Sequence, residues 1–291
     1  MDTVVVRVPA TIANLGPGFD SIGLALAWHN EVRIERASTG LEISAAGPGA
    51  EQIPRDETNL VARALVTVIG EASPVRINQL IAIPAGRGFG SSAAAVVGGL
   101  IAGRALAATS HTDADLLEMA VALEGHADNV APCLLGGVTV STEQRTVRLD
   151  PPKGIIPLVC VAPGSMSTKH ARATLPDEVS RAHAVSNIGR AALLGAALAH
   201  GRADILMDAT DDLLHQPQRF ELMPESGELV RALRGKGIAA FLAGAGPSVA
   251  ALVDEAVGTD AEAAARALAP DGWEVRLESI DPAGARVVAD R

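Results

Sequence analysis

Two stretches of alternating side chains mark the beginning of the chain. Apolar residues alternate with their neighbours over residues 4–8, and apolar and charged residues alternate over residues 31–35. A period of two is typical of a β-strand with one buried face. Between them lies a Gly/Pro-rich segment at residues 14–18, which is typical of a turn. The pattern therefore predicts β-structure over residues 3–36 with a turn inside it.

Further along, the hydrophobic pattern predicts both helices and strands. Leu60, Ala64 and Val68 share one helical face, which predicts a helix over residues 59–69. The other predicted helices cover residues 93–108, 113–124, 178–200, 203–214 and 227–234. Short apolar runs predict strands at residues 41–53 (with a loop), 75–83, 157–161, 238–242 and 274–277.

A change of sequence character near residue 150 suggests two domains. The segment Pro151-Pro152-Lys153-Gly154 is typical of a linker turn, and a buried strand follows it. A chain of 291 residues is long enough for two modest domains. We therefore expect an N-terminal domain at residues 1–150 and a C-terminal domain at residues 151–291.

Composition narrows the class of protein. Hydrophobic residues make up 48% and charged residues 20%, which predicts a packed core. A net charge of −10, an aromatic content of 2% and the lack of a Lys/Arg cluster argue against nucleic-acid binding. Neither a signal peptide nor an apolar run of the ~20 residues that a membrane span needs is visible, so a cytoplasmic protein is expected. Cys133 and Cys160 fit buried thiols in a reducing compartment.

The strongest chemical signal is PAGRGFGSSAAA at residues 84–95, between a predicted strand and a predicted helix. Alternating glycines at Gly86, Gly88 and Gly90 allow positive φ angles, so backbone N–H groups can turn toward an anion. Two serines then open the helix, where free N–H groups favour phosphate. The segment lacks the Lys of a Walker loop and the spacing of a dinucleotide motif. The alternative is a glycine-rich turn whose serine caps the helix.

This loop is one of four ordered motifs. The others are VPATIANLGPGFD at residues 8–20, EGHADNVAP at residues 124–132 and LAGAGPS at residues 242–248. Together they resemble the motifs of the GHMP kinases, which include galactokinase, mevalonate kinase and homoserine kinase, and the segments ANLGPGFD and EGHADNVAP have the form typical of homoserine kinases. The chain departs from the usual Leu, Pro and Ser at Phe89, Ala127 and Ala243.

The resemblance implies an α+β fold with two lobes. The N-terminal lobe, of ribosomal-protein type, would carry the ATP-binding loop, and a ferredoxin-like α/β C-terminal lobe would complete the substrate site. It implies transfer of the γ-phosphoryl group of ATP, with Mg²⁺, to the hydroxyl of homoserine in threonine biosynthesis, and dimers are common in the family. The implied ATP-binding residues are Asn59, Pro84, Gly86, Arg87, Gly88, Phe89, Gly90, Ser91, Ser92, Ala93 and Gly246.

Three residues are the implied catalytic group, and two of them are the implied metal ligands. Ser92 and Glu118 would bind Mg²⁺, while Asn129 would orient the reacting hydroxyl. Glu118 stands in the middle of a predicted helix. Glu124, which opens the EGHADN segment, is the rival ligand and is expected to brace that segment instead. Asn59 is equally suited to capping a helix.

The implied substrate site matches the three polar groups of homoserine. Asp20 would pair with the ammonium, arginines would bind the carboxylate through their planar fork, and asparagines would hold the rest of the molecule. The implied substrate-binding residues are Asn14, Asp20, His126, Asn129, Thr168, Arg172 and Arg219.

The resemblance also implies transfer without a dedicated carboxylate base, which suits a loose transition state and leaves Asp128 a structural role. Three alternatives stay open. The first is a GHMP kinase for mevalonate or a sugar, which an unpaired Asp20 would disfavour. The second is a GHMP-fold protein that binds a ligand without catalysis. The third is a nucleic-acid-binding module, which the acidic charge disfavours.

Overall fold

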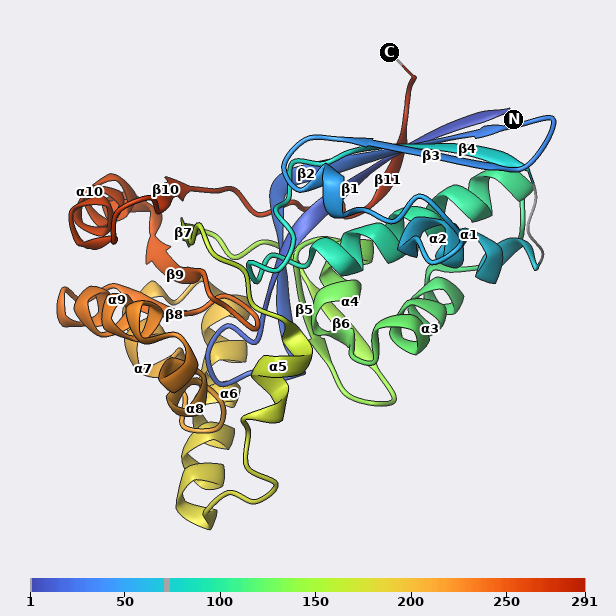
Figure 1. Ribbon diagram of the computed structural model, residues 1–291. Coiled ribbons are helices and arrows are strands. Elements are labelled where there is room, and N and C mark those ends of the chain that lie inside the picture. The colour runs from blue at the N-terminus through green and yellow to red at the C-terminus, as the bar shows by residue number, and fades with distance from the viewer. Residues whose placement is uncertain (1, 71–73, 291) are drawn as a thin grey trace.

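Two β-sheets with helices packed against them form the structure, a computed structural model that describes residues 2–70 and 74–290 (Figure 1). Within those residues the first sheet has seven strands, in the order β11-β1-β2-β4-β3, and β5 and β6 extend it from the start of β2. Among the strand pairs of the described residues, only β3 and β4 are parallel. The strands are β1 Thr3–Ala13, β2 Ile22–Arg36, β3 Leu41–Ala46, β4 Val75–Leu80, β5 Val138–Ser141, β6 Thr146–Leu149 and β11 Arg286–Val288.

Four helices lie on one side of this sheet, below it in Figure 1. They are α1 Leu60–Ile69, α2 Ser91–Ala107, α3 Asp113–Glu124 and α4 Ala127–Leu135. Most residues of α2 are buried, because it runs through the core between the sheet and the other helices. A Cβ on Gly99 would lie 2.4 Å from the carbonyl oxygen of Val61, so glycine is what lets α1 and α2 approach each other closely.

The second sheet is antiparallel, with the order β10-β7-β9-β8 over the described residues. Its strands are β7 Ile155–Val161, β8 Ala239–Leu242, β9 Val249–Asp254 and β10 Glu274–Leu277. Leu158, Leu233, Val249 and Val275 belong to a core of its own. The helices of this half are α5 Thr168–Ala173, α6 Arg181–His200, α7 Leu206–Ala209, α8 Gln216–Leu222, α9 Pro224–Gly235 and α10 Gly258–Leu268.

Strand β11 brings the chain back to the first sheet after the second is complete. It pairs antiparallel with β1, with Val288 opposite Val5. The first sheet is therefore built from both ends of the described chain. The boundary near residue 150 stays a prediction, because β11 lies in the N-terminal sheet.

Most predicted elements are confirmed, with corrections where side chains bind the backbone. The predicted helix at residues 203–214 is too long, because α7 ends at Ala209. Thr210 Oγ1 donates to the carbonyl of Leu206 (2.8 Å) and the Asp212 carboxylate accepts the N–H of Leu214 (3.1 Å), so these side chains compete with helical hydrogen bonds.

The predicted strand at residues 75–83 is too long for a similar reason. Strand β4 ends at Leu80, and Asn30 Oδ1 then accepts the N–H groups of Ala82 (2.7 Å) and Ile83 (2.8 Å). The hydrophobic pattern also missed several strands and α-helices, which are β5, β6, β9, β11, α4, α5, α8 and α10.

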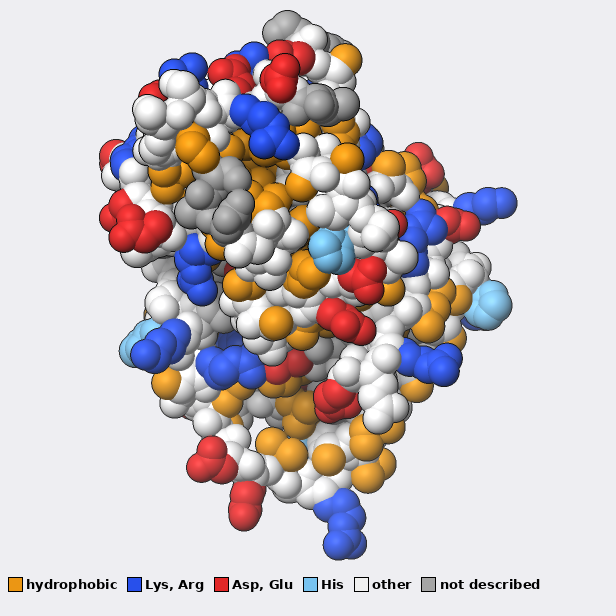
Figure 2. Space-filling model, turned by 90° about the vertical axis from the view of Figure 1, so that its right-hand side faces the viewer, with side chains coloured by type: hydrophobic (Ala, Val, Ile, Leu, Met, Phe, Trp, Pro, Cys, Tyr) orange, Lys and Arg blue, Asp and Glu red, His pale blue; other side chains and the backbone are white. Residues whose placement is uncertain are grey.

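The surface carries both signs of charge. In Figure 2 basic and acidic side chains are interspersed over the face shown, as on a solvated surface rather than along a basic stripe. Of the helices in the described ranges, none combines the length and hydrophobicity that crossing a membrane requires.

Candidate active site

A cavity of about 590 Å³ lies where the four sequence motifs meet. Its wall includes the turn after β1, the glycine loop that leads into α2, the start of α4, helix α5 and the turn after β8. The two halves of the chain therefore both contribute to it. Motifs separated by more than two hundred residues in the sequence face one space, which supports reading them as parts of a single site.

The glycine loop crosses the cavity and has the predicted backbone. Gly86, Gly88 and Gly90 have φ angles of 67°, 86° and 65°, and α2 begins at Ser91. A Cβ on Gly88 would lie 2.0 Å from the carbonyl oxygen of Ala243, so this position must be glycine for the loop to pack on the turn after β8. The loop thus presents its backbone and a helix N-terminus to the cavity, as an anion site requires.

The remaining loop residues have supporting positions. Phe89 is buried, with its ring 5.3 Å from that of Trp28, and its carbonyl accepts the N–H of Thr11 (3.1 Å). Arg87 donates to the carbonyls of Pro163 (2.6 Å) and Gly164 (3.2 Å), which ties the loop to the second half of the chain. The cavity wall itself includes Gly86, Gly88, Phe89, Gly90, Ser91, Ser92, Ala93 and Gly246, whereas Pro84 and Arg87 lie outside it.

A carboxylate other than the predicted Glu118 lies beside Ser92. Ser92 Oγ donates a hydrogen bond to Glu124 Oε1, and both residues line the cavity. Glu118 is exposed, and it precedes Glu124 by six residues on α3, which is about 9 Å along the helix and on a different face. That Glu118 binds the metal stays a prediction, while Glu124 is the carboxylate that the structure places beside Ser92. A hydroxyl and a carboxylate side by side are the oxygen donors that Mg²⁺ prefers.

Asn59 lies at the far end of the cavity, and its side chain caps α1. Its Oδ1 accepts the N–H groups of Val61 (2.9 Å) and Ala62 (3.3 Å), and its Nδ2 donates to the carbonyl of Pro54 (2.9 Å). The capping role is confirmed, and a contact with adenine stays a prediction. This end is mostly apolar, with Val32, Ile53, Leu60 and Ile81 in its wall.

Gln79, at this apolar end, was missed by sequence reasoning. It lies on β4 and is 5% exposed, and its Nε2 has no hydrogen-bond partner among residues 2–70 and 74–290. It is in phase with the buried Val75 and Ile77, but a pattern of alternation could not reveal an unpaired donor.

The start of α4 holds a second polar group. The carboxylate of Asp128, 2% exposed, hydrogen-bonds with Nδ1 of His126 (2.6 Å), and this contact raises the pKa of His126 above its ordinary value. Asn129 Oδ1 accepts a hydrogen bond from the hydroxyl of Thr11 (2.7 Å). A Cβ on Gly23 would lie 1.8 Å from the carbonyl oxygen of Asp128, so glycine on β2 allows α4 to begin here.

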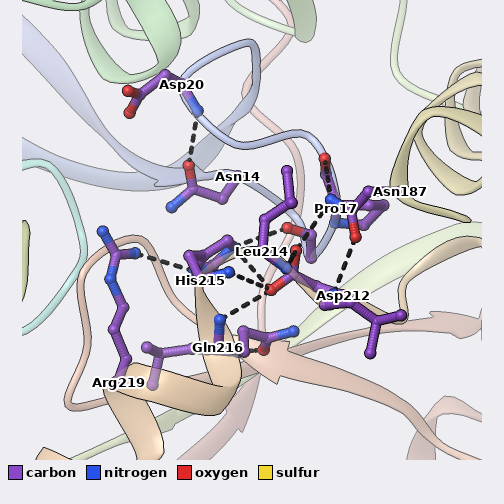
Figure 3. Close-up of polar contacts among 12 residues, drawn as sticks. Asn14, Pro17, Asp20, Asn187, Asp212, Leu214, His215, Gln216 and Arg219 are labelled. Carbon is purple, nitrogen blue, oxygen red and sulfur yellow. Dashed lines mark hydrogen bonds and ion pairs between the residues drawn. The ribbon is translucent and has the colours of Figure 1, made fainter. Parts of the chain in front are cut away.

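An ion pair joins the first motif to α5. The guanidinium of Arg172 binds both carboxylate oxygens of Asp20, at 2.9 and 2.7 Å, and this contact raises the pKa of Arg172. Asp20 has a φ of 55°, and its N–H donates to Asn14 Oδ1 (3.0 Å; Figure 3). Thr168 and Lys169 lie beside this pair in the cavity wall. Lys169 is a cation that sequence reasoning did not assign.

Arg219 is the most buried cation of the site. It is 2% exposed, and its Nη1 donates to the carbonyl of Gly244 (3.1 Å) and to Nδ1 of His215 (3.1 Å; Figure 3). Asn14 Nδ2 donates to the same carbonyl of Gly244 (3.1 Å). Burial lowers the pKa of Arg219 to about 10, so the side chain is still charged at neutral pH. A buried charge needs a partner, and a carboxylate in the cavity would supply one.

Comparison with known proteins agrees with the motifs. Residues 59–137 match the family described as GHMP kinases N terminal domain, and residues 185–271 match GHMP kinases C terminal. The chain is 46% identical to a homoserine kinase of Streptomyces avermitilis, over 98% of this chain and 95% of that protein. The chain belongs to the GHMP kinases, among the homoserine kinases.

Two further relatives support that membership. A homoserine kinase of Streptomyces coelicolor is 45% identical over 98% of this chain and 94% of its own length. The crystal structure of a homoserine kinase from Cytophaga hutchinsonii superposes with a TM-score of 0.87, with 27% identity, covering 99% of this chain and 98% of that one. The α+β fold with N- and C-terminal GHMP kinase domains is thereby confirmed.

Proposed function

We propose that this homoserine kinase relative transfers the γ-phosphoryl group of ATP to the side-chain hydroxyl of L-homoserine, which gives O-phospho-L-homoserine in threonine biosynthesis. The observation that carries the proposal is one cavity with two unlike ends. The apolar end near Asn59 suits the adenine base of ATP. The charged end with Asp20, Arg172 and Arg219 suits a zwitterionic amino acid such as homoserine. The glycine loop lies between them, where a triphosphate would bridge the two.

At the nucleotide end, the loop 86–92 and the N-terminus of α2 would hold the phosphates of ATP, and Ser92 with Glu124 would hold Mg²⁺. When bound, the metal neutralises negative charge on the phosphate oxygens. The chain's own part is to fix these donors before the reaction, because phosphoryl transfer depends mainly on positioning and electrostatics.

At the acceptor end, Asp20 would bind the ammonium of homoserine, and Arg172 and Arg219 would bind its carboxylate. Because Asp20 and Arg172 pair with each other, a ligand that separates them must offer both charges to replace the lost contact. A zwitterion does so, whereas mevalonate, which lacks an ammonium, leaves Asp20 unpaired. Asn14, His126 and Thr168 lie around the same space and would complete the binding of the acceptor.

Asn129 would orient the reacting hydroxyl, and Asp128 would hold His126 rather than remove a proton. This follows from the hydrogen bond that the Asp128 carboxylate already makes to His126 and from the weak need for a base in a loose transition state. Steady-state kinetics of Asp128→Asn are the test. A loss above ~10⁴-fold with an intact fold, which is the upper end of general-base contributions, would show that Asp128 is the base.

The function itself is tested by coupled measurement of ADP release with homoserine, threonine, serine and mevalonate as acceptors. Homoserine is expected to give the highest kcat/KM. Faster turnover of mevalonate, or ATP binding without ADP release for every acceptor, would overturn the proposal. A cytoplasmic location and a homodimer stay predictions, and sedimentation of the purified protein tests the latter.

A further inference from the structure

A buried polar cluster lies directly behind Arg219 and joins α6, α8 and the turn after β1 (Figure 3). Asp212, His215 and Asn187 form it, with exposed fractions of 4%, 0% and 2%. Asp212 Oδ2 accepts the N–H groups of His215 (3.0 Å) and Gln216 (2.8 Å), which fixes the start of α8. Asn187 Nδ2 donates to Asp212 Oδ1 (3.0 Å) and to the carbonyl of Pro17 (3.2 Å). The start of α8, the helix that carries Arg219, is therefore held in place by Asp212, by Asn187 on α6 and by the turn after β1.

The contacts of His215 determine which ring nitrogen carries its proton. Nε2 lies 2.9 Å from the carbonyl oxygen of Gly16 and 3.5 Å from Asp212 Oδ2, and both of these atoms only accept hydrogen bonds. Nδ1 lies 3.1 Å from Nη1 of Arg219, which only donates. Nε2 must therefore carry the hydrogen and Nδ1 must present its lone pair. Burial lowers the pKa of His215, the charge of Arg219 lowers it further, and the charge of Asp212 acts in the opposite direction. The lowered pKa agrees with a neutral ring.

This arrangement leaves one edge of Arg219 free. Nη1 is occupied by His215 and by the carbonyl of Gly244. In the described part of the chain, Nε of Arg219 is buried without a hydrogen-bond partner, although the residue lines the cavity. The ring of Phe19 stacks on His215 at 5.0 Å and lies 5.3 Å from the Arg219 guanidinium, which restricts its tilt. With Nη1 occupied, the Nε–Nη2 edge remains, and this edge can bind a carboxylate with two parallel hydrogen bonds.

We propose that His215 is a positioning residue. As the neutral Nε2–H tautomer it accepts a hydrogen bond from Nη1 of Arg219 and thereby presents the Nε–Nη2 edge of Arg219 to the carboxylate of the acceptor. The proposal rests on the proposed function and deepens it, because it names the group that selects an acceptor with a carboxylate. His215 itself has no contact with the acceptor.

Two substitutions of His215 separate the two ring nitrogens. In His215→Asn the amide oxygen replaces the Nδ1 acceptor, and in His215→Gln the amide nitrogen replaces the Nε2 donor while nothing accepts from Arg219. Both lose the stacking on Phe19, so they are matched for that defect. His215→Gln is expected to raise the KM for homoserine by about tenfold or more, with kcat and the KM for ATP unchanged. His215→Asn is expected to keep the KM for homoserine within about threefold of the parent.

An acceptor without a carboxylate, 3-aminopropan-1-ol, is the control substrate. The kcat/KM for it should be the same in the parent and both variants, because Arg219 has nothing to bind. An equal loss for both acceptors, a raised KM for ATP, or an unchanged homoserine KM in His215→Gln would overturn the proposal. Thermal unfolding of the two variants shows whether they are equally stable, and a shared loss of homoserine binding in both would also contradict the role given to Nδ1.

The tautomer is tested without turnover by ¹⁵N-resolved NMR of histidine-labelled parent protein at neutral pH. A protonated Nε2 and an unprotonated Nδ1 are expected for His215, and an Nδ1–H tautomer or an imidazolium would refute the assignment. This spectrum is independent of which acceptor is phosphorylated. A failure of the proposed function and a failure of this inference are therefore distinguishable.

Discussion

A comparison of the Glu124→Gln variant with a matched Glu118→Gln variant tests which carboxylate of α3 binds the metal. Glu124 contacts Ser92 in the cavity wall, while Glu118 is exposed. Both changes remove one negative charge from the same helix and keep the size and shape of the side chain. Any difference between them therefore reports position and not helix propensity or net charge.

The expected sizes follow from the distances. At about 9 Å through water a carboxylate and a divalent cation attract by about 0.9 kcal/mol, and salt at physiological strength reduces this to about 0.3 kcal/mol. Glu118→Gln should therefore change the Mg²⁺ dependence by less than about twofold. Loss of a direct charged contact is worth about 1.5–3 kcal/mol, so Glu124→Gln should lower kcat/KM about 10- to 150-fold.

The assay is ADP release titrated with Mg²⁺ at fixed ATP and homoserine, with thermal unfolding to check that both variants fold. Binding of Mn²⁺ together with a non-hydrolysable ATP analogue, followed by electron paramagnetic resonance, gives a readout that does not need turnover. Equal effects of the two substitutions, or a Glu124→Gln variant within about twofold of the parent, would refute the assignment of Glu124.

Three further predictions concern the loop, the apolar end and pH. Gly88→Ala should lower the free energy of unfolding by about 2 kcal/mol or more and weaken ATP-analogue binding, because a positive φ and a clash with Ala243 combine. The control is Gly237→Ala, which has a φ of 79° and open space around it among the described residues, so it should show only the effect of φ. Equal losses of Tm in the two variants would contradict this prediction. Gln79→Met should raise the free energy of unfolding without nucleotide by about 1 kcal/mol in urea denaturation, because it removes a buried unpaired donor, and a loss of stability would show that the donor is satisfied. Because Asp128 raises the pKa of His126 above 6.5, their pairing should stabilise the fold fully below pH 6.5 and less as pH rises through the raised pKa. The variant His126→Asn should therefore show a flatter dependence of Tm on pH in this range. An unchanged dependence would argue against the pair.

The correct predictions rested on sequence patterns that act over a few neighbouring residues. The loop at residues 84–95 was predictable because alternating glycines and two serines fix the backbone within a few residues. Helices α1, α2 and α3 were predictable from their apolar faces and end signals, such as Thr112 before α3 and Gly125 after it. The family resemblance then indicated which motifs share one cavity, although no local signal contains that information.

The errors and omissions depend on contacts between distant segments. Sequence order did not show that Glu124, and not Glu118, faces Ser92, since that depends on how α3 packs against α2. The segment at residues 203–214 has helical composition, but Asp212 binds the backbone at the start of α8 instead. His215 bonds to Gly16 across almost two hundred residues, so its role could not be predicted from its neighbours in the sequence.

The pairing of β11 with β1 has a consequence for how the protein is made. During synthesis β1 leaves the ribosome well before its neighbour β11, centred on Val287, because the whole second sheet is made between them. Until β11 emerges, this edge of β1 is unpaired, which is the kind of surface that recruits other strands and aggregates. A nascent chain that stalls before residue 286 would contain its glycine loop but not the complete first sheet. Emergence of β11 is thus the step at which the first sheet can become complete.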